Sequence, residues 1–160
     1  MPSPLPPPAN LLDQAETICR RRGVRLTAQR RRVLAILSAA GRPLGAYEIL
    51  EQMRAGSRPL APPTVYRALD FLLEQGLIHK LESLHAFVGC PHPDHRHASQ
   101  FLICSDCGRV TELEHEAVAD SLRSIASAAG FRASRPIVEL IGICAECDDA
   151  SEDTPDEPAC

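Results

Sequence analysis

The sequence predicts an α+β protein with two unlike parts, a helical N-terminal half ending in a hairpin and a smaller α/β half. Helical apolar patterns bounded by Gly or Pro fill residues 10–75, and a hairpin pattern follows them. Strand and helix patterns then alternate around two Cys-x-x-Cys pairs. The charge changes with the pattern, because residues 1–80 carry twelve Lys and Arg against six Asp and Glu, and residues 81–160 carry five against fifteen. We therefore expect a basic half that meets an anionic partner and an acidic half with another task.

The first three helices are expected from their ends and their apolar residues. After a Pro-rich start, residues 1–9, which we expect to be disordered, Asn10 begins a helix that Gly23 ends. Thr27 caps a second helix, with an apolar stripe that leaves Arg30 largely outside it. A third helix covers about residues 46–53.

The fourth helix lies in PPTVYRALDFLLEQG, which has prolines at its start and a glycine at its end. Val65, Leu69 and Leu72 recur at i, i+4 and i+7 and should face the core. The remaining polar and aromatic residues should point away from it: Thr64, Tyr66, Arg67 and Asp70. LIHKLE and HAFVGC then predict a β-hairpin, and short helices followed by a hairpin predict a winged helix-turn-helix.

The second half reads as α/β. QFLIC and RVTELE predict strands, HEAVADSLRSIASAAG a helix, and FRASRPIVELIGIC one or two further strands. The expected domains are a winged-helix domain, a hinge and metal loop, an α/β domain, and a disordered acidic tail: residues 10–83, 84–97, 98–147 and 148–160.

Composition restricts the class of protein. MPSPLPPPAN has neither the basic nor the apolar region of a signal peptide, and no apolar run approaches the ~18 residues that a membrane span needs. We expect a soluble, cytoplasmic protein without a membrane partner. Seven cysteines in such a protein indicate metal or thiol chemistry in preference to a disulfide framework.

Two Cys-x-x-Cys pairs predict a structural zinc site. Cys104 with Cys107, and Cys144 with Cys147, offer four thiolates, the ligand set of a closed tetrahedral zinc site. The short spacing within each pair lets both sulfurs reach one ion at about 2.3 Å. A thiol redox pair, or buried cysteines without a ligand, remain the alternatives.

A second group of ligand residues lies around the hairpin. His79, Cys90, His97 and Glu112 would make a mixed sulfur, nitrogen and oxygen tetrahedron that suits zinc. They come from both halves of the chain, so a metal there would fix the angle between the halves and could act as a switch. Spacing alone equally allows a surface His79 and a solvated His-Pro-Asp-His loop.

Three motifs resemble the ferric uptake regulator superfamily, in particular its zinc uptake regulator branch. They are RLTAQR (25–30), PPTVYRALDFLLEQGLIHKLES (62–83) and the two Cys-x-x-Cys pairs, and the resemblance covers about residues 10–147. It implies a dimeric repressor that binds a palindromic, AT-rich operator when loaded with zinc and controls zinc-uptake genes. Binding of two dimers to one operator stays open, and no small-molecule substrate is expected.

The resemblance also implies roles for individual residues. Cys104, Cys107, Cys144 and Cys147 match the structural zinc site, and His79, Cys90, His97 and Glu112 match the regulatory zinc site, which makes two zinc ions per chain. Tyr66 and Arg67 match DNA-contacting positions of the recognition helix, to which we add Thr64. Arg25 and Arg30 would supply phosphate contacts.

Other readings depend on a few positions. The iron-type regulators carry a His-His-Asp-His run where this chain has Ala98-Ser99-Gln100-Phe101, which argues against sensing of iron, manganese or peroxide. His92, His95 and His115 have no place in the two sites and would form at most a weak third one.

A zinc-dependent hydrolase or deaminase is the alternative of another class, but a deaminase has His-x-Glu with Pro-Cys-x-x-Cys, and this chain lacks both. We therefore expect that this protein is not an enzyme. Cys19 and Cys160 receive no role.

Overall fold

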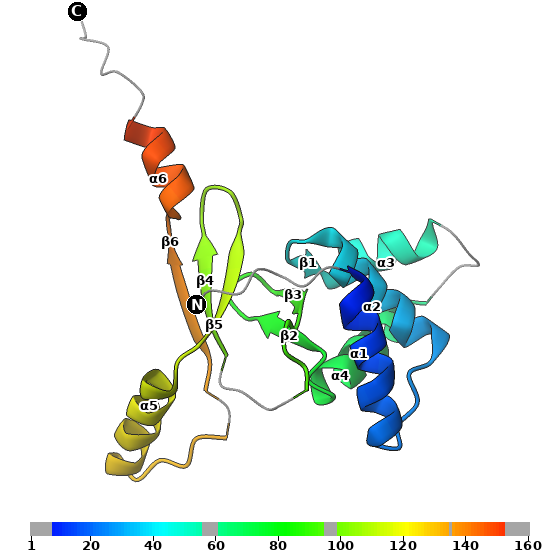
Figure 1. The fold of residues 1–160 in the computed structure, drawn as a ribbon, viewed down its shortest axis with the longest axis horizontal. Helices are drawn as coiled ribbons and strands as arrows, with labels where there is room; N and C mark the ends of the chain where they lie inside the picture. Colours follow the sequence, from blue (N-terminus) through cyan, green and yellow to red (C-terminus); the bar gives the residue numbers. More distant parts are fainter. Residues whose placement is uncertain (1–7, 56–60, 95–98, 135, 153–160) are drawn as a thin grey trace, which may run out of the picture. The chain divides into compact units, whose positions relative to one another are not determined.

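The computed structural model describes residues 8–55, 61–94, 99–134 and 136–152 (Figure 1). The chain divides into two units between residues 98 and 99. None of the helices in these described ranges is long and apolar enough to cross a membrane.

The first unit is a helical bundle with a small sheet. Its described residues form four helices and three strands: α1 (Pro8–Arg21), α2 (Ala28–Ala40), β1 (Leu44–Gly45), α3 (Ala46–Arg54), α4 (Pro62–Glu74), β2 (Ile78–Leu81) and β3 (Ala86–Gly89). Helix α2 packs against α1, α3 and α4, and Leu34, Leu69 and Leu72 are buried in the core that these helices share.

Local signals set the ends of these helices. The Thr27 hydroxyl accepts a hydrogen bond from the backbone N–H of Arg30 at the start of α2, and Gly41 ends this helix in the left-handed conformation with φ 61°. Pro62 and Pro63 occupy the first turn of α4, where their missing N–H groups cost nothing.

The predicted hairpin is confirmed. β2 and β3 pair antiparallel, with His79 opposite Val88 and Ile78 opposite Gly89. The two-residue strand β1 adds to the other edge of β3, giving the order β1-β3-β2. β1 is too short to leave a periodic signal in the sequence, and it was not expected.

The second unit has a three-stranded sheet and two helices within its described residues: β4 (Ser99–Cys104), β5 (Val110–Glu114), α5 (Glu116–Ala128), β6 (Val138–Gly142) and α6 (Ala145–Glu152). The strand order is β5-β4-β6, with β5 antiparallel and β6 parallel to the central strand β4. The stretch FRASRPIVELIGIC thus supplies one strand.

Three boundaries differ from the expectation. The predicted hairpin strand within HAFVGC, now β3, takes up part of residues 84–97, the range also expected as a hinge, because its residues pair with both β1 and β2. Helix α6 includes residues 148–152, expected to be disordered, and acidic side chains in its first turn suit the positive end of the helix dipole. Helix α1 begins at Pro8, because proline is accepted in a first turn. Residues 1–7 and 153–160 lie outside the described residues.

Candidate functional site

The two Cys-x-x-Cys pairs lie at one edge of the second unit's sheet. Cys104 ends β4, and Cys144 follows the end of β6. Because β4 and β6 are parallel, with Cys104 opposite Gly142, their carboxyl ends bring both pairs to the same edge. The backbone N–H of Ser105 donates to the carbonyl of Gly142 over 2.8 Å and joins the two loops.

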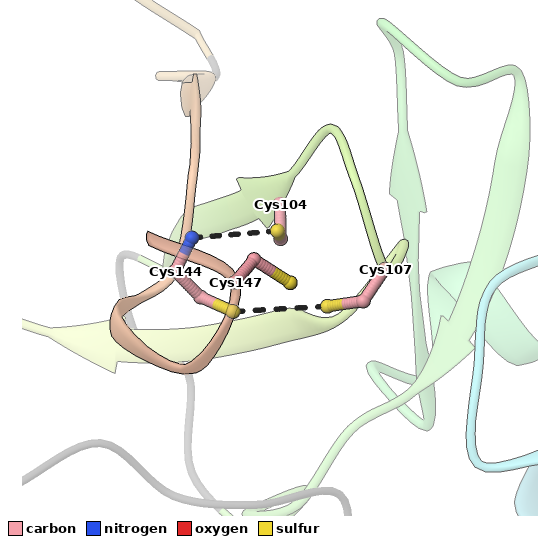
Figure 2. A group of neighbouring side chains, drawn as sticks. All are labelled: Cys104, Cys107, Cys144 and Cys147. Atoms are coloured by element: carbon pink, nitrogen blue, oxygen red, sulfur yellow. Dashed lines mark hydrogen bonds between the residues drawn. The ribbon is translucent and has the colours of Figure 1, made fainter. Parts of the chain in front are cut away.

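The four thiol groups converge on one point, as Figure 2 shows. All four sulfur atoms lie within 4.8 Å of one another, and Sγ of Cys107 is 3.7 Å from Sγ of Cys144. Four sulfurs that each lie at about 2.3 Å from a tetrahedral zinc ion are about 3.8 Å apart. The sulfurs therefore already have nearly the spacing that a zinc ion requires, so the residues fit the metal.

The electrostatic environment of the tetrad favours a thiolate at Cys104. Backbone N–H groups of Cys107 and Cys144 donate to its sulfur and lower the pKa of this thiol to about 6. The neighbouring thiols of Cys144 and Cys107 raise the pKa of Cys147 to about 12. Metal binding deprotonates such thiols, so loading of the tetrad releases protons.

An ion pair joins the two Cys-x-x-Cys loops. Arg109, two residues after Cys107, donates hydrogen bonds from Nη1 and Nη2 to the two carboxylate oxygens of Glu146, which lies between Cys144 and Cys147; each N···O distance is 2.5 Å. The hydrogen bonds to Glu146 and the negative charge of its carboxylate raise the pKa of Arg109 above its usual value. This pair leaves no local signal in the sequence, because its partners are 37 residues apart.

His79 and Cys90 come together on the first unit's sheet. His79 lies on β2, and Cys90 directly follows β3, where its N–H donates to the carbonyl of Leu77 over 3.0 Å. This register puts both side chains on one face, and their ligand atoms lie within 4.8 Å of each other. The thiol of Cys90 is fully buried.

Glu112 lies on β5 of the second unit and is only 6% exposed. Its Oε1 accepts a hydrogen bond from the hydroxyl of Ser99 over 2.5 Å. His97 lies outside the described residues, as does His95. Among the residues that the structure describes, the groups of potential metal ligands include neither His92 nor His115.

The expected DNA-binding residues lie mainly on the exposed side of α4. Tyr66 is 52% exposed and Arg67 is also exposed, whereas Thr64 is half-buried. Val65, Leu69 and Leu72 are buried, as expected from their spacing: these residues hold α4 on the core.

The two arginines expected to contact phosphate differ in their surroundings. Arg25 is exposed. Arg30 is half-buried, its guanidinium stacks over the ring of Phe71 at 3.5 Å, and one of its nitrogens donates to the carbonyl of Arg25 over 2.6 Å. These contacts fix the position of the Arg30 charge against α4.

The structure also shows an exposed aromatic residue on another helix of the first unit. Tyr47, in the first turn of α3, is 73% exposed. It lies off the buried stripe formed by Ile49, Leu50 and Met53, so the helical period of α3 was the signal that would have marked it as a surface residue.

Comparisons with known proteins agree on one family. The model of the ferric uptake regulator family matches residues 21–141. The zinc uptake regulation protein of Escherichia coli is 45% identical over 138 residues, which cover 86% of this chain and 81% of that protein. The peroxide operon regulator of Bacillus subtilis is 28% identical over 87% of this chain and 94% of its own length. A solved zinc uptake regulator complexed with zinc and DNA superposes with a TM-score of 0.87 at 42% identity, covering 91% of this chain and 97% of that chain. The chain belongs to the ferric uptake regulator family.

Proposed function

We propose that this protein is a zinc-responsive transcriptional repressor, which binds palindromic operator DNA as a dimer and controls zinc-uptake genes. We infer that it acts in the cytoplasm. The observation that carries the proposal is the buried thiol of Cys90 beside His79, on the sheet of the unit that also carries the exposed face of α4. The similarity to relatives named as zinc uptake regulators supports it.

The cysteine tetrad would hold a structural zinc ion. Zinc bound there would supply a tetrahedral cross-link between two loops, on the order of 10 kcal/mol of folding free energy. The second unit needs such a cross-link, because the main buried apolar cluster of the described residues consists wholly of residues from the first unit.

His79, Cys90, His97 and Glu112 would hold a regulatory zinc ion. A thiolate with imidazole and carboxylate ligands favours zinc over the harder Fe²⁺ and Mn²⁺. The four residues belong to both parts of the chain, so their shared binding of one ion would restrict how the parts move and select the DNA-binding arrangement.

DNA binding would use α4 and the basic residues near it. Arg67 can donate to a guanine edge in the major groove, and Tyr66 can contact a thymine methyl group or a phosphate. Arg25 and Arg30 would contribute sequence-independent phosphate contacts. Thr64, at the start of α4, would contact the sugar-phosphate backbone of the DNA.

Dimerisation would use the apolar surface of the second unit. Val118, Leu122 and Ile125 form an exposed stripe on α5, and Leu140 and Ile141 are exposed on the edge strand β6. An apolar edge strand and an apolar helix face are aggregation hazards unless a partner covers them. Each operator would take one dimer or two.

The first test is the zinc content of the purified protein before and after mild chelation, with mobility shift on an AT-rich palindrome beside it. We expect two zinc ions per chain, of which one is removed by chelation together with DNA binding. One tightly held zinc ion, with DNA binding indifferent to chelation, would contradict the sensing function.

A pair of cysteine variants tests which buried thiol of the first unit takes part in the zinc response. Cys90→Ser should leave a folded dimer that no longer binds DNA more tightly when zinc is added, because it removes a regulatory ligand. Cys19→Ser is the matched control, because Cys19 is buried in α1 and belongs to neither ligand group, and it should respond to zinc normally. A normal zinc response in Cys90→Ser would remove Cys90 from the site.

Two other functions are distinguished by the same preparation. A regulator of iron, manganese or peroxide response would bind the operator with Fe²⁺ or Mn²⁺ and not with zinc. A zinc-dependent hydrolase or deaminase would turn over peptides or nucleosides, and we propose that this protein does not.

A further inference from the structure

The hydrogen bond between Ser99 and Glu112 has no role in the function proposed above. Ser99 is the first residue of β4, and its hydroxyl donates to Oε1 of Glu112 on β5 over 2.5 Å. In the register of the two strands Ser99 is opposite Glu114 and Glu112 is opposite Phe101, so the bond crosses the ladder diagonally on one face. A distance of about 2.5–2.7 Å is typical of a hydroxyl that donates to a charged carboxylate.

Ser99 itself is held in a fixed place. The next residue, Gln100, points to the opposite face of the strand and is only 4% exposed. Its Oε1 accepts from the backbone N–H of His115 over 2.9 Å, where β5 ends and α5 begins. Side chains on both faces therefore tie the start of β4 to the end of β5, and they fix the backbone from which the Ser99 hydroxyl reaches Glu112.

The hydroxyl controls the orientation of a buried carboxylate. The last side-chain torsion of a glutamate is broad, so a carboxylate without a fixed neighbour samples many orientations. A hydrogen bond to one oxygen restricts this rotation, and outer hydrogen bonds of this kind orient metal ligands and increase their affinity.

We propose that Ser99 is a positioning residue that sets the affinity of the regulatory zinc site, by holding the carboxylate of Glu112 in its metal-binding orientation. This rests on the ligand role proposed for Glu112. Ser99 thereby sets the zinc concentration at which the repressor binds its operator. Ser99 does not contact the metal. It affects binding of the zinc ion only through its hydrogen bond to Glu112.

The test compares two substitutions of nearly equal shape in the full-length protein. Ser99→Thr keeps the hydroxyl and Ser99→Val replaces it with a methyl group, and both residues suit a strand. The affinity of the removable zinc is measured by competition with a chelator, and the free zinc concentration at half-maximal operator binding is measured by mobility shift. Ser99→Val should weaken zinc binding about 10- to 100-fold and shift the half-maximal zinc concentration equally, whereas Ser99→Thr should match the unchanged protein.

Controls separate positioning from a purely structural role. Ser121→Ala removes a hydroxyl that donates to a backbone carbonyl on exposed α5, and it should change neither measurement. Zinc in the cysteine tetrad should stay bound in all these variants. Equal zinc affinities for Ser99→Val and Ser99→Thr, with zinc lost in Glu112→Ala, would overturn the role of Ser99 alone. Full retention of the removable zinc in Glu112→Ala would overturn the role of Glu112 as well.

Discussion

At the scale of single residues, Arg67 is the side chain that we propose for base recognition. It lies on the exposed side of α4, while Val65, Leu69 and Leu72 fix the opposite side in the core. Arg67→Ala should weaken operator binding on the order of 10- to 100-fold, because a guanidinium can donate two hydrogen bonds to one guanine. Mobility shift at fixed salt and saturating zinc measures this loss.

The control for Arg67→Ala removes one positive charge from the second unit. Arg132 is exposed in the second unit, and Arg132→Ala should leave operator binding unchanged. If Arg67→Ala weakens binding to operator and unrelated DNA equally, Arg67 contacts phosphate and not a base.

At the scale of elements, the Arg109–Glu146 pair links the loop after β4 to the first turn of α6. The guanidinium also offsets the negative charge of four thiolates. Arg109→Glu and Glu146→Arg should each speed the release of tetrad zinc to a chelator, about 10-fold as for other outer-shell changes. The double variant restores an opposite-charge pair and should release zinc at nearly the original rate. Equally fast release from the double variant would show that the pair does not hold the loops together.

The sequence allowed the grouping of the four cysteines to be predicted because each Cys-x-x-Cys spacing is local. It also allowed helices α2 and α4 to be predicted, since Thr27, Gly41 and the paired prolines mark their ends within a few residues. Contacts between distant residues left no such signal. The Ser99–Glu112 bond depends on the register of β4 and β5, and the Arg109–Glu146 pair depends on the parallel pairing of β4 with β6.

At the scale of the whole molecule, the two units differ in their charge and in how much apolar surface they expose. Most of the buried apolar side chains described in the first unit form one cluster, and this unit carries most of the basic residues. In the second unit the described residues leave large apolar side chains exposed on both α5 and β6. A protein that reads a palindrome needs two copies of its recognition helix, and the second unit offers the surface that would join them.

A charge placed on α5 tests this division directly. Ile125 is 67% exposed in the apolar stripe, and Ile125→Glu would bury a carboxylate in the dimer interface, so it should yield a monomer in light scattering. Operator affinity should then fall on the order of 100-fold or more, because one chain engages a single half-site. Zinc in the tetrad should be retained, since α5 holds none of its ligands. Ser124→Glu adds the same charge on another side of the helix and should remain dimeric. A dimeric Ile125→Glu variant would place the dimer interface elsewhere.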